Sequence, residues 1–257
     1  MGGSYIQRII KHKLHNGEVI FEVLMSDGRI HVQSIERISR FWRGKNYALE
    51  RLYNQYVPEW SKTRSFLDQN RPTEIIDVGG NIGEFALSCA KEFPNSRIFV
   101  FEPDPIVFEC LQRNIEDAKL QARVIPIQTA LSSSNSPQDF YIATESADSS
   151  LVRPEKHFRS IRVVTRRLED FLQDEKIRTI GLLKMDAEGF EPEVLMGMGK
   201  MIVQCKAFAI DVSPERNGLD TEEEVIDLLN PLGFNIEHAT GQGKRKFVLA
   251  FLSNRQN

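Results

Sequence analysis

From Glu74 onward, short apolar runs alternate with stretches of helical periodicity, and this alternation constrains the fold more than any other feature. The apolar runs are EIIDVG, RIFVFEP, RVIPIQTAL, IGLLKMDA and AFAIDVS, and amphipathic segments such as IGEFALSCAKEF and TEEEVIDLLNPLG separate most of them. This pattern is typical of a mostly parallel sheet with helices on both faces. The last two runs, FNIEHAT and KFVLAFLS, have no helix between them. They predict an antiparallel final hairpin at the edge of an α/β fold.

The first 70 residues differ from the rest of the chain. EVIFEVLM and RIHVQS flank the turn residues SDG, which predicts a β-hairpin. The stretch 46–69 that follows has aromatic and aliphatic residues at helical spacing, interrupted by Pro58. The aromatic residues between Phe41 and Trp60 are expected to pack the cap against the core, with a pocket lining as the alternative. We therefore predict an N-terminal β-hairpin and helical cap (1–70) and a main domain (71–257). Within the main domain, segment 132–167 is a candidate lid because its pattern weakens; DFYIAT and IRVVTRR are candidate strands there, and ESADSSLVRPEKHF a mobile loop.

Composition excludes several classes of protein. A formal net charge of −3 provides no basic field, which disfavours nucleic acid as a partner. Three widely spaced cysteines indicate buried thiols in a reducing compartment. No apolar run approaches membrane-spanning length, and the N-terminus lacks the apolar block of a secretory signal. We expect a cytoplasmic protein without a membrane span; the sequence leaves open whether it forms a homo-oligomer.

The stretch IIDVGGNIGEF places a glycine-rich turn between the first strand of the main domain and its helix. Gly79, Gly80 and Gly83 do not match the dinucleotide pattern G-x-G-x-x-G. Asp77 precedes the turn, which favours a cationic or hydroxyl-bearing ligand over a pyrophosphate. Glu102 follows Gly83 by 19 residues, at the end of the next strand, where an acid accepts hydrogen bonds from ribose hydroxyls. The turn and the acid together predict a nucleoside-bearing cofactor.

Several motifs resemble the FkbM-type methyltransferases, a branch of the class I S-adenosylmethionine (SAM)-dependent enzymes. The similar segments are DVGGNIG, FEPDP, LQRNI, TALSS, VVTRRLEDFL and LLKMDAEGFEPEVLMG, so the resemblance covers Ile75 to Leu252. The most specific element is the pattern K-x-D-x-E-G-x-E, formed by Lys184, Asp186, Glu188, Gly189 and Glu191. There are two departures: Gly80 replaces the usual alanine, a tolerable change between small residues, and Asp211 stands where glutamate is common.

The resemblance implies a seven-stranded sheet with SAM over the carboxyl ends of the first strands. Asp77, Gly79 and Gly83 would shape the pocket for the methionine part, and Glu102 would hold the ribose. Adenine contacts would come from Pro103, Asp104, Gln128, Thr129 and Ala130. The full set of expected cofactor-binding residues is Asp77, Gly79, Gly80, Asn81, Gly83, Glu102, Pro103, Asp104, Thr129, Ala130 and Asp186.

The chemistry of methyl transfer directs attention to the acids after the fourth strand. A hydroxyl acceptor needs a base or a metal as its proton leaves. In one mechanism, Asp186 or Glu188 accepts the proton and Lys184 orients the carboxylates. In the other, Asp186 with Glu188 or Asp211 holds Mg²⁺. Glu191, before Pro192, is expected to stabilise the start of a helix instead.

His157, in the candidate lid, and His238, at the end of the sixth strand, are alternative bases. A lone histidine is more often a surface or packing residue. No histidine lies near Asp186 and Glu188 in sequence, which argues against zinc.

The expected function is SAM-dependent O-methyl transfer to a hydroxyl of a small molecule or glycan. A sugar is the leading acceptor only because the resemblance implies it for many members. The alternatives are an N-methyltransferase, a lipid or polyketide methyltransferase, and a non-catalytic SAM-binding scaffold. A nucleotide-dependent oxidoreductase is disfavoured by the glycine spacing and the final hairpin.

Overall fold

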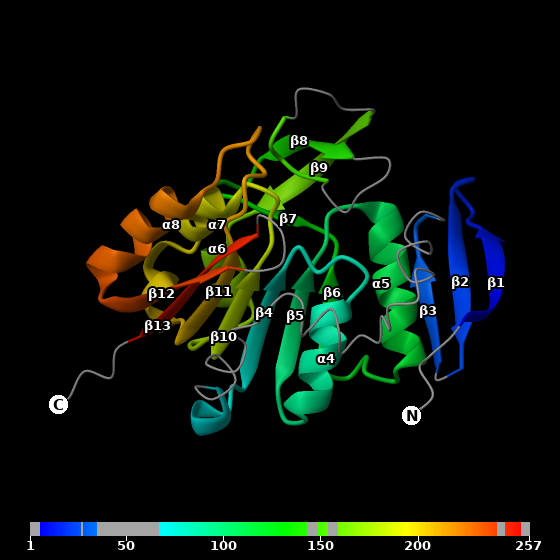
Figure 1. Ribbon diagram of the computed structural model, residues 1–257, viewed down its shortest axis with the longest axis horizontal. Coiled ribbons are helices and arrows are strands. Elements are labelled where there is room, and N and C mark those ends of the chain that lie inside the picture. Colours follow the sequence, from blue (N-terminus) through cyan, green and yellow to red (C-terminus); the bar gives the residue numbers. More distant parts are fainter. Residues whose placement is uncertain are drawn as a thin grey trace.

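A seven-stranded sheet forms the centre of the protein (Figure 1). The computed structural model describes residues 6–26, 28–34, 67–142, 149–153, 159–240 and 245–252. The order across the sheet is β12 (Phe234–Thr240), β13 (Lys246–Leu252), β11 (Ala207–Asp211), β10 (Leu182–Met185), β4 (Glu74–Val78), β5 (Arg97–Phe101) and β6 (Val124–Ile127). All neighbours are parallel except β13, which runs antiparallel to both β11 and β12. The predicted α/β class with an antiparallel final hairpin is confirmed.

Helices cover both faces of this sheet (Figure 1). One face carries α4 (Glu84–Glu92) and α5 (Pro105–Asp117); the other carries α6 (Leu168–Asp174), α7 (Glu191–Gly197) and α8 (Glu222–Leu229). Two short 3₁₀ helices follow α7 and α8, at Gly199–Gln204 and Asn230–Leu232.

The apolar residues of the central sheet pack into two cores, one on each face. In β4, Ile75 packs with α4 and α5, and Ile76 packs with α6 and α7; both side chains are fully buried. Burial of such a side chain stabilises the fold by about 1.5–3 kcal/mol. The near-continuous apolar strands read from the sequence therefore follow from burial on both faces.

A separate three-stranded antiparallel sheet lies beside α5, on its far side from the central sheet (Figure 1). It consists of β1 (Ile6–Lys13), β2 (Val19–Met25) and β3 (Gly28–Val32). The predicted hairpin is the β2–β3 pair, and β1 is an addition that the sequence did not indicate. Apolar residues of β2 and β3 pack against Val107 and Cys110 of α5. Most of the predicted helical and aromatic part of the cap, residues 35–66, lies outside the described residues; residues 67–70 are helical. The division of the chain at residue 70 stays a prediction.

The candidate lid contains a small sheet of its own. β8 (Pro137–Ile142) pairs antiparallel with β9 (Arg159–Arg166), and β9 pairs with the short β7 (Ala130–Leu131). Both candidate strands of this segment are confirmed. Residues 143–148 and 154–158, which include His157, lie outside the described residues. The role as a lid stays a prediction.

Two other expectations concern the cysteines and the membrane. Cys89, Cys110 and Cys205 are buried thiols outside any disulfide, as predicted. None of the helices in the described residues has the length and apolar character needed to cross a bilayer. The cytoplasmic location stays a prediction.

Candidate active site

The glycine-rich turn folds tightly between the ends of β4, β5 and β10. The N–H groups of Gly79 and Gly80 both donate to the carbonyl of Phe101, at 3.1 and 3.0 Å. Gly79 has φ +68°, and a Cβ there would lie 1.9 Å from the carbonyl oxygen of Asp186. The turn therefore requires glycine at this position. At Gly79 the turn directly contacts the backbone of Asp186.

The other two glycines fit their surroundings as closely. Gly83 has φ +97° and precedes the first residue of α4. A Cβ on Gly80 would lie 2.0 Å from Cγ1 of Val100. The alanine usual in the family would thus require Val100 to shift, so the glycine matches the packing of this chain.

Glu102 lies at the end of β5, and its carboxylate is fixed beside the turn. It is 7% exposed, and its two oxygens accept the N–H groups of Asn81 and Asp104, each at 2.9 Å. Each carboxylate oxygen has a second acceptor site. The geometry therefore holds an acid in a fixed position next to the glycine turn.

Asp104 has a structural contact that the sequence analysis did not assign. Its carboxylate caps α5 by accepting the N–H groups of Ile106 (2.8 Å) and Val107 (3.3 Å). Burial raises its pKa, and the two capping hydrogen bonds oppose that rise. The sequence contained the signal, because an aspartate before a proline is typical of a helix start.

Lys184 contacts different groups from those expected. Its ammonium lies 3.1 Å from Oδ1 of Asp77 on the neighbouring strand, and it donates to the carbonyls of Gly79 (3.0 Å) and Val78 (3.3 Å). Burial raises the pKa of Asp77; burial lowers that of Lys184, but attraction to Asp77 and Asp186 outweighs this and leaves it raised. Lys184 therefore secures the glycine turn and Asp77; it was expected to orient the acids of its own segment.

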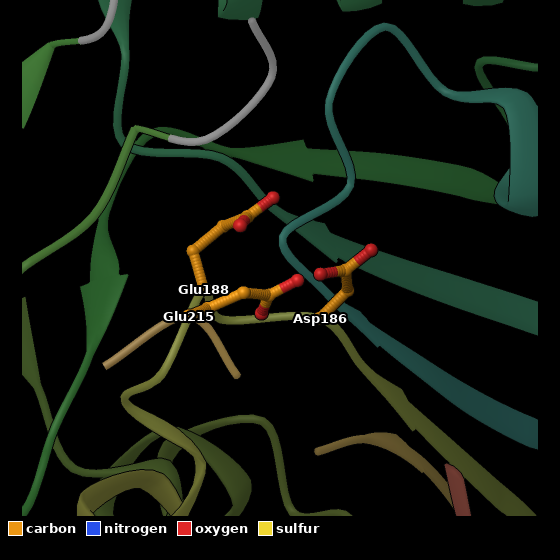
Figure 2. Close-up of side chains that lie close together, drawn as sticks. All are labelled: Asp186, Glu188 and Glu215. Carbon is orange, nitrogen blue, oxygen red and sulfur yellow. The ribbon is translucent and has the colours of Figure 1, made fainter. Parts of the chain in front are cut away.

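Three carboxylates converge at the carboxyl ends of β10 and β11 (Figure 2). Asp186 follows β10, Glu188 lies in the next turn, and Glu215 lies in the loop after β11. One oxygen from each lies within 4.8 Å of the other two. The Asp186 side chain is 10% exposed, and Glu188 as a whole residue is 9% exposed. Glu188 has φ +52°, an uncommon conformation for a residue with a side chain. We call these three residues the acidic cluster.

Glu215 was missed by the sequence analysis. It lies 29 residues after Asp186, in a loop without a motif, and only the parallel pairing of β10 with β11 brings it to the same edge. Burial raises its pKa to about 9, and the nearby charges of Asp186 and Asp211 add to the effect. The available signal was the expected position of β11 beside β10.

Asp211 and Glu191 lie close by, but their oxygens are engaged by donors. Asp211 accepts the N–H and hydroxyl of Ser213, and Nη1 of Arg245 lies 2.7 Å from its Oδ2. Burial raises the pKa of Asp211 to about 6, the charge of Asp186 adds to this, and Arg245 opposes it. These contacts suit Asp211 to holding Arg245, which differs from the expected role in catalysis.

Glu191 is fully buried and holds the turn that carries Glu188. Its Oε1 accepts the N–H groups of Ala187 (3.0 Å) and Gly189 (3.1 Å), and the Thr221 hydroxyl donates to Oε2 (2.9 Å). Burial raises its pKa to about 7. These contacts match the structural role expected from its position before Pro192.

Other expected site residues lie at the border of the site. The Thr129 hydroxyl donates to the carbonyl of Val164 in β9, and Ala130 is buried in β7. His238 lies on the edge strand β12, is 60% exposed and contacts Glu222 at 2.8 Å, which fits a surface residue better than a base. Ser150, from the candidate lid, donates to the carbonyl of Glu188 at 2.7 Å. The candidate lid segment therefore contacts the backbone of Glu188, a member of the acidic cluster.

Comparison with known proteins identifies relatives of this chain. It is 32% identical over 144 residues to methyltransferase 1 of Beauveria bassiana, a match that covers 48% of this chain and 57% of that protein. It is 26% identical over 240 residues to the hexuronic acid methyltransferase AglP of Haloferax volcanii, which covers 93% of this chain and 90% of that protein. With the 2-O-methyltransferase NoeI of Sinorhizobium fredii it shares 26% identity, over 64% of this chain and 74% of that protein.

A solved structure and a family model agree with these relatives. The structure comes from Klebsiella pneumoniae and is assigned as an O-methyltransferase; its TM-score is 0.51 at 12% identity, covering 84% of this chain and 94% of that one, so it supports the fold alone. The model of the methyltransferase FkbM domain matches residues 77–236, which contain the glycine turn and the acidic cluster. The chain therefore belongs to the FkbM family of methyltransferases.

Proposed function

We propose that this protein is a SAM-dependent O-methyltransferase that methylates a hydroxyl group of a sugar, either free or within a glycan. One observation carries the proposal: the glycine turn contacts Asp186 directly, so the candidate cofactor pocket adjoins the acidic cluster. A donor and an acceptor would thus meet at one edge of the sheet. Close, aligned placement of reactants is the main contribution that an enzyme can make to such a displacement.

SAM fits the cofactor side better than a dinucleotide does. Its ribose hydroxyls would donate to the carboxylate of Glu102. Oδ1 of Asn81 is buried without a hydrogen-bond donor among the described residues, which suits a ligand with an ammonium or hydroxyl group. Asp77 is fully buried against Lys184, so we assign it to shaping the turn through that pair. Pro103, Thr129 and Ala130 would border the adenine.

The reaction follows from the same arrangement. A lone pair of the acceptor oxygen attacks the methyl carbon as the carbon–sulfur bond breaks, and that bond's electron pair stays on sulfur. The hydroxyl proton passes to a carboxylate of the acidic cluster, with Asp186 the first candidate because it directly follows β10 beside the turn. The products are the methyl ether and S-adenosylhomocysteine, with the proton held by the protein. General base catalysis of this kind contributes about 10²–10⁴-fold to the rate.

A sugar acceptor is supported by the similarity to the hexuronic acid methyltransferase AglP and to the 2-O-methyltransferase NoeI. Carboxylates are also suitable partners for the many hydroxyl donors of a sugar. An amine, lipid or polyketide acceptor is the alternative, and a screen that includes an amino sugar separates oxygen from nitrogen transfer. A SAM-binding scaffold without turnover is a further alternative.

Calorimetry followed by an activity screen tests the proposal. We expect S-adenosylhomocysteine to bind and NAD⁺ not to bind. We then expect methyl transfer from SAM to glucuronic acid, glucose or a related sugar. Asp186→Asn should lower turnover at least about 100-fold, the lower bound for losing a general base, and leave the affinity for S-adenosylhomocysteine within about threefold, well below 1.4 kcal/mol. A folded protein that binds no S-adenosylhomocysteine would refute the proposal; undiminished turnover in Asp186→Asn would remove Asp186 from the chemistry.

A further inference from the structure

We propose that Asp186, Glu188 and Glu215 bind one divalent cation of the oxygen-preferring class, Mg²⁺ or Mn²⁺, on the acceptor side of the site. The binding itself is argued from the acidic cluster; the cation's part in methyl transfer rests on the proposed function. Figure 2 shows the three carboxylates directed toward a common region.

The spacing of the carboxylates suits such an ion. Mg²⁺ binds oxygen at about 2.0–2.1 Å, so oxygens on opposite sides of the ion are about 4.2 Å apart. One oxygen from each residue of the cluster already lies within 4.8 Å of the other two. Small side-chain rotations therefore suffice, with no movement of β10 or β11. Three protein ligands leave further positions of an octahedral ion for water and for the acceptor.

Unpaired buried oxygens are an independent indication. Oδ1 of Asp186 and Oε2 of Glu215 are buried, and neither has a hydrogen-bond donor among the described residues. The Asp186 side chain is 10% exposed. A buried carboxylate oxygen without a partner is costly. The neighbouring Asp211 and Glu191 show that this region can supply donors to both oxygens of an acid. Asp186 and Glu215 therefore each have a buried oxygen that no donor of the described residues reaches, and a cation would take the donor's place.

The described cations near the cluster make their shortest contacts with groups outside it. Arg245 lies 2.7 Å from Asp211 but 4.0 Å from Oδ2 of Asp186, beyond hydrogen-bond distance. Arg216 donates to the carbonyl of Gly189 and to Glu193 and Glu224. Lys184 is held by Asp77. A divalent ion would add positive charge beside the unpaired oxygens of Asp186 and Glu215. The ligand set contains oxygen only, and this favours Mg²⁺ or Mn²⁺ over zinc.

This site also narrows the class of acceptor. A bound divalent ion would lower the pKa of a coordinated hydroxyl and so help its deprotonation. With more than one open position, it suits an acceptor that presents two adjacent oxygens, such as a sugar diol or a hydroxy acid. A hexuronic acid in particular carries its own negative charge, which the Asp186 carboxylate would repel in the absence of a cation.

Manganese binding can be measured without any turnover. We would titrate chelator-treated protein, saturated with S-adenosylhomocysteine, with Mn²⁺ and follow free Mn²⁺ by electron paramagnetic resonance. We expect one ion per chain, displaced by Mg²⁺. Glu215→Gln and Glu188→Gln should each weaken binding at least about tenfold, since each removes a charged ligand. Glu223→Gln, an exposed acid in the first turn of α8, is the matched control and should bind as the parent does.

The outcomes separate this inference from the proposed function. Absence of a bound ion, or equal binding by the parent and both cluster variants, would overturn the cation site. Methyl transfer that proceeds at full rate in chelator would overturn the cation's role, while the proposed function stands. Loss of transfer in chelator, restored by Mg²⁺, would support both. If S-adenosylhomocysteine fails to bind but Mn²⁺ binding depends on Glu215 and Glu188, the cation site stands and the proposed function falls.

Discussion

Replacement of Gly79 by alanine tests the contact between the glycine turn and the backbone of Asp186. The residue has φ +68°, and its added Cβ would lie 1.9 Å from the backbone oxygen of Asp186. Because that oxygen belongs to the main chain, no side-chain rotation relieves the overlap. The ends of β4 and β10 must move apart, or the turn must change shape.

The expected cost has two parts. A residue with a Cβ in the left-handed region costs about 1–2 kcal/mol. Insertion of a methyl group against fixed backbone costs about 1–3 kcal/mol more, so Gly79→Ala should lower the free energy of unfolding by about 2–5 kcal/mol. Gly233→Ala is the matched control: this glycine has φ +86°, but nothing lies within 4 Å of its added Cβ. It should show only the first part.

Urea unfolding and calorimetry would measure both consequences. The displaced turn carries the N–H of Asn81 away from Glu102, so Gly79→Ala should also weaken S-adenosylhomocysteine binding at least tenfold, or about 1.4 kcal/mol. Gly233→Ala should leave that affinity unchanged. Equal stabilities and equal affinities for the two variants would show that the turn does not pack on Asp186 as described.

Three further predictions concern Glu102, Asn114 and Glu191. Glu102→Gln removes a charged acceptor, worth about 1.5–3 kcal/mol, so calorimetry should show about 10- to 150-fold weaker binding of S-adenosylhomocysteine; an unchanged dissociation constant would reject the ribose assignment. Asn114 in α5 donates to the carbonyls of Ile82 in the turn and His31 in β3, and Asn114→Ala should cost about 1–3 kcal/mol in urea unfolding because these buried carbonyls lose their donor; a change below about 0.5 kcal/mol, typical of surface substitutions, would contradict this. Glu191 has a pKa raised by burial from 4.5 to about 7, so the stability that its protonated form contributes is complete below pH 4.5 and is lost as the pH rises through 7. In chelated buffer, Glu191→Gln should match the parent at low pH and exceed its stability at pH 8 by on the order of 3 kcal/mol; parallel pH profiles would refute the assignment.

The sequence by itself determined the layered fold and its family. Alternation of apolar strands and amphipathic helices is a local pattern, and burial of each strand on both faces follows from it, as Ile75 and Ile76 show. No helix separates FNIEHAT from KFVLAFLS, and a short connection can join only antiparallel neighbours, so the sequence also predicted the final hairpin. The cofactor candidates Gly79 and Glu102 were also readable, because each directly follows a strand whose carboxyl end defines the edge where ligands bind.

The tertiary structure decided which side chains act together. Lys184 was expected to orient the carboxylates of Asp186 and Glu188, yet it reaches across to Asp77, because parallel pairing places β4 beside β10. Asp211 ends β11 and Glu215 follows only four residues later, yet the first binds Arg245 and the second joins the acidic cluster. Such a choice depends on how separate loops meet at the sheet edge and on which donors each buried carboxylate finds there. Spacing along one chain segment contains neither piece of information.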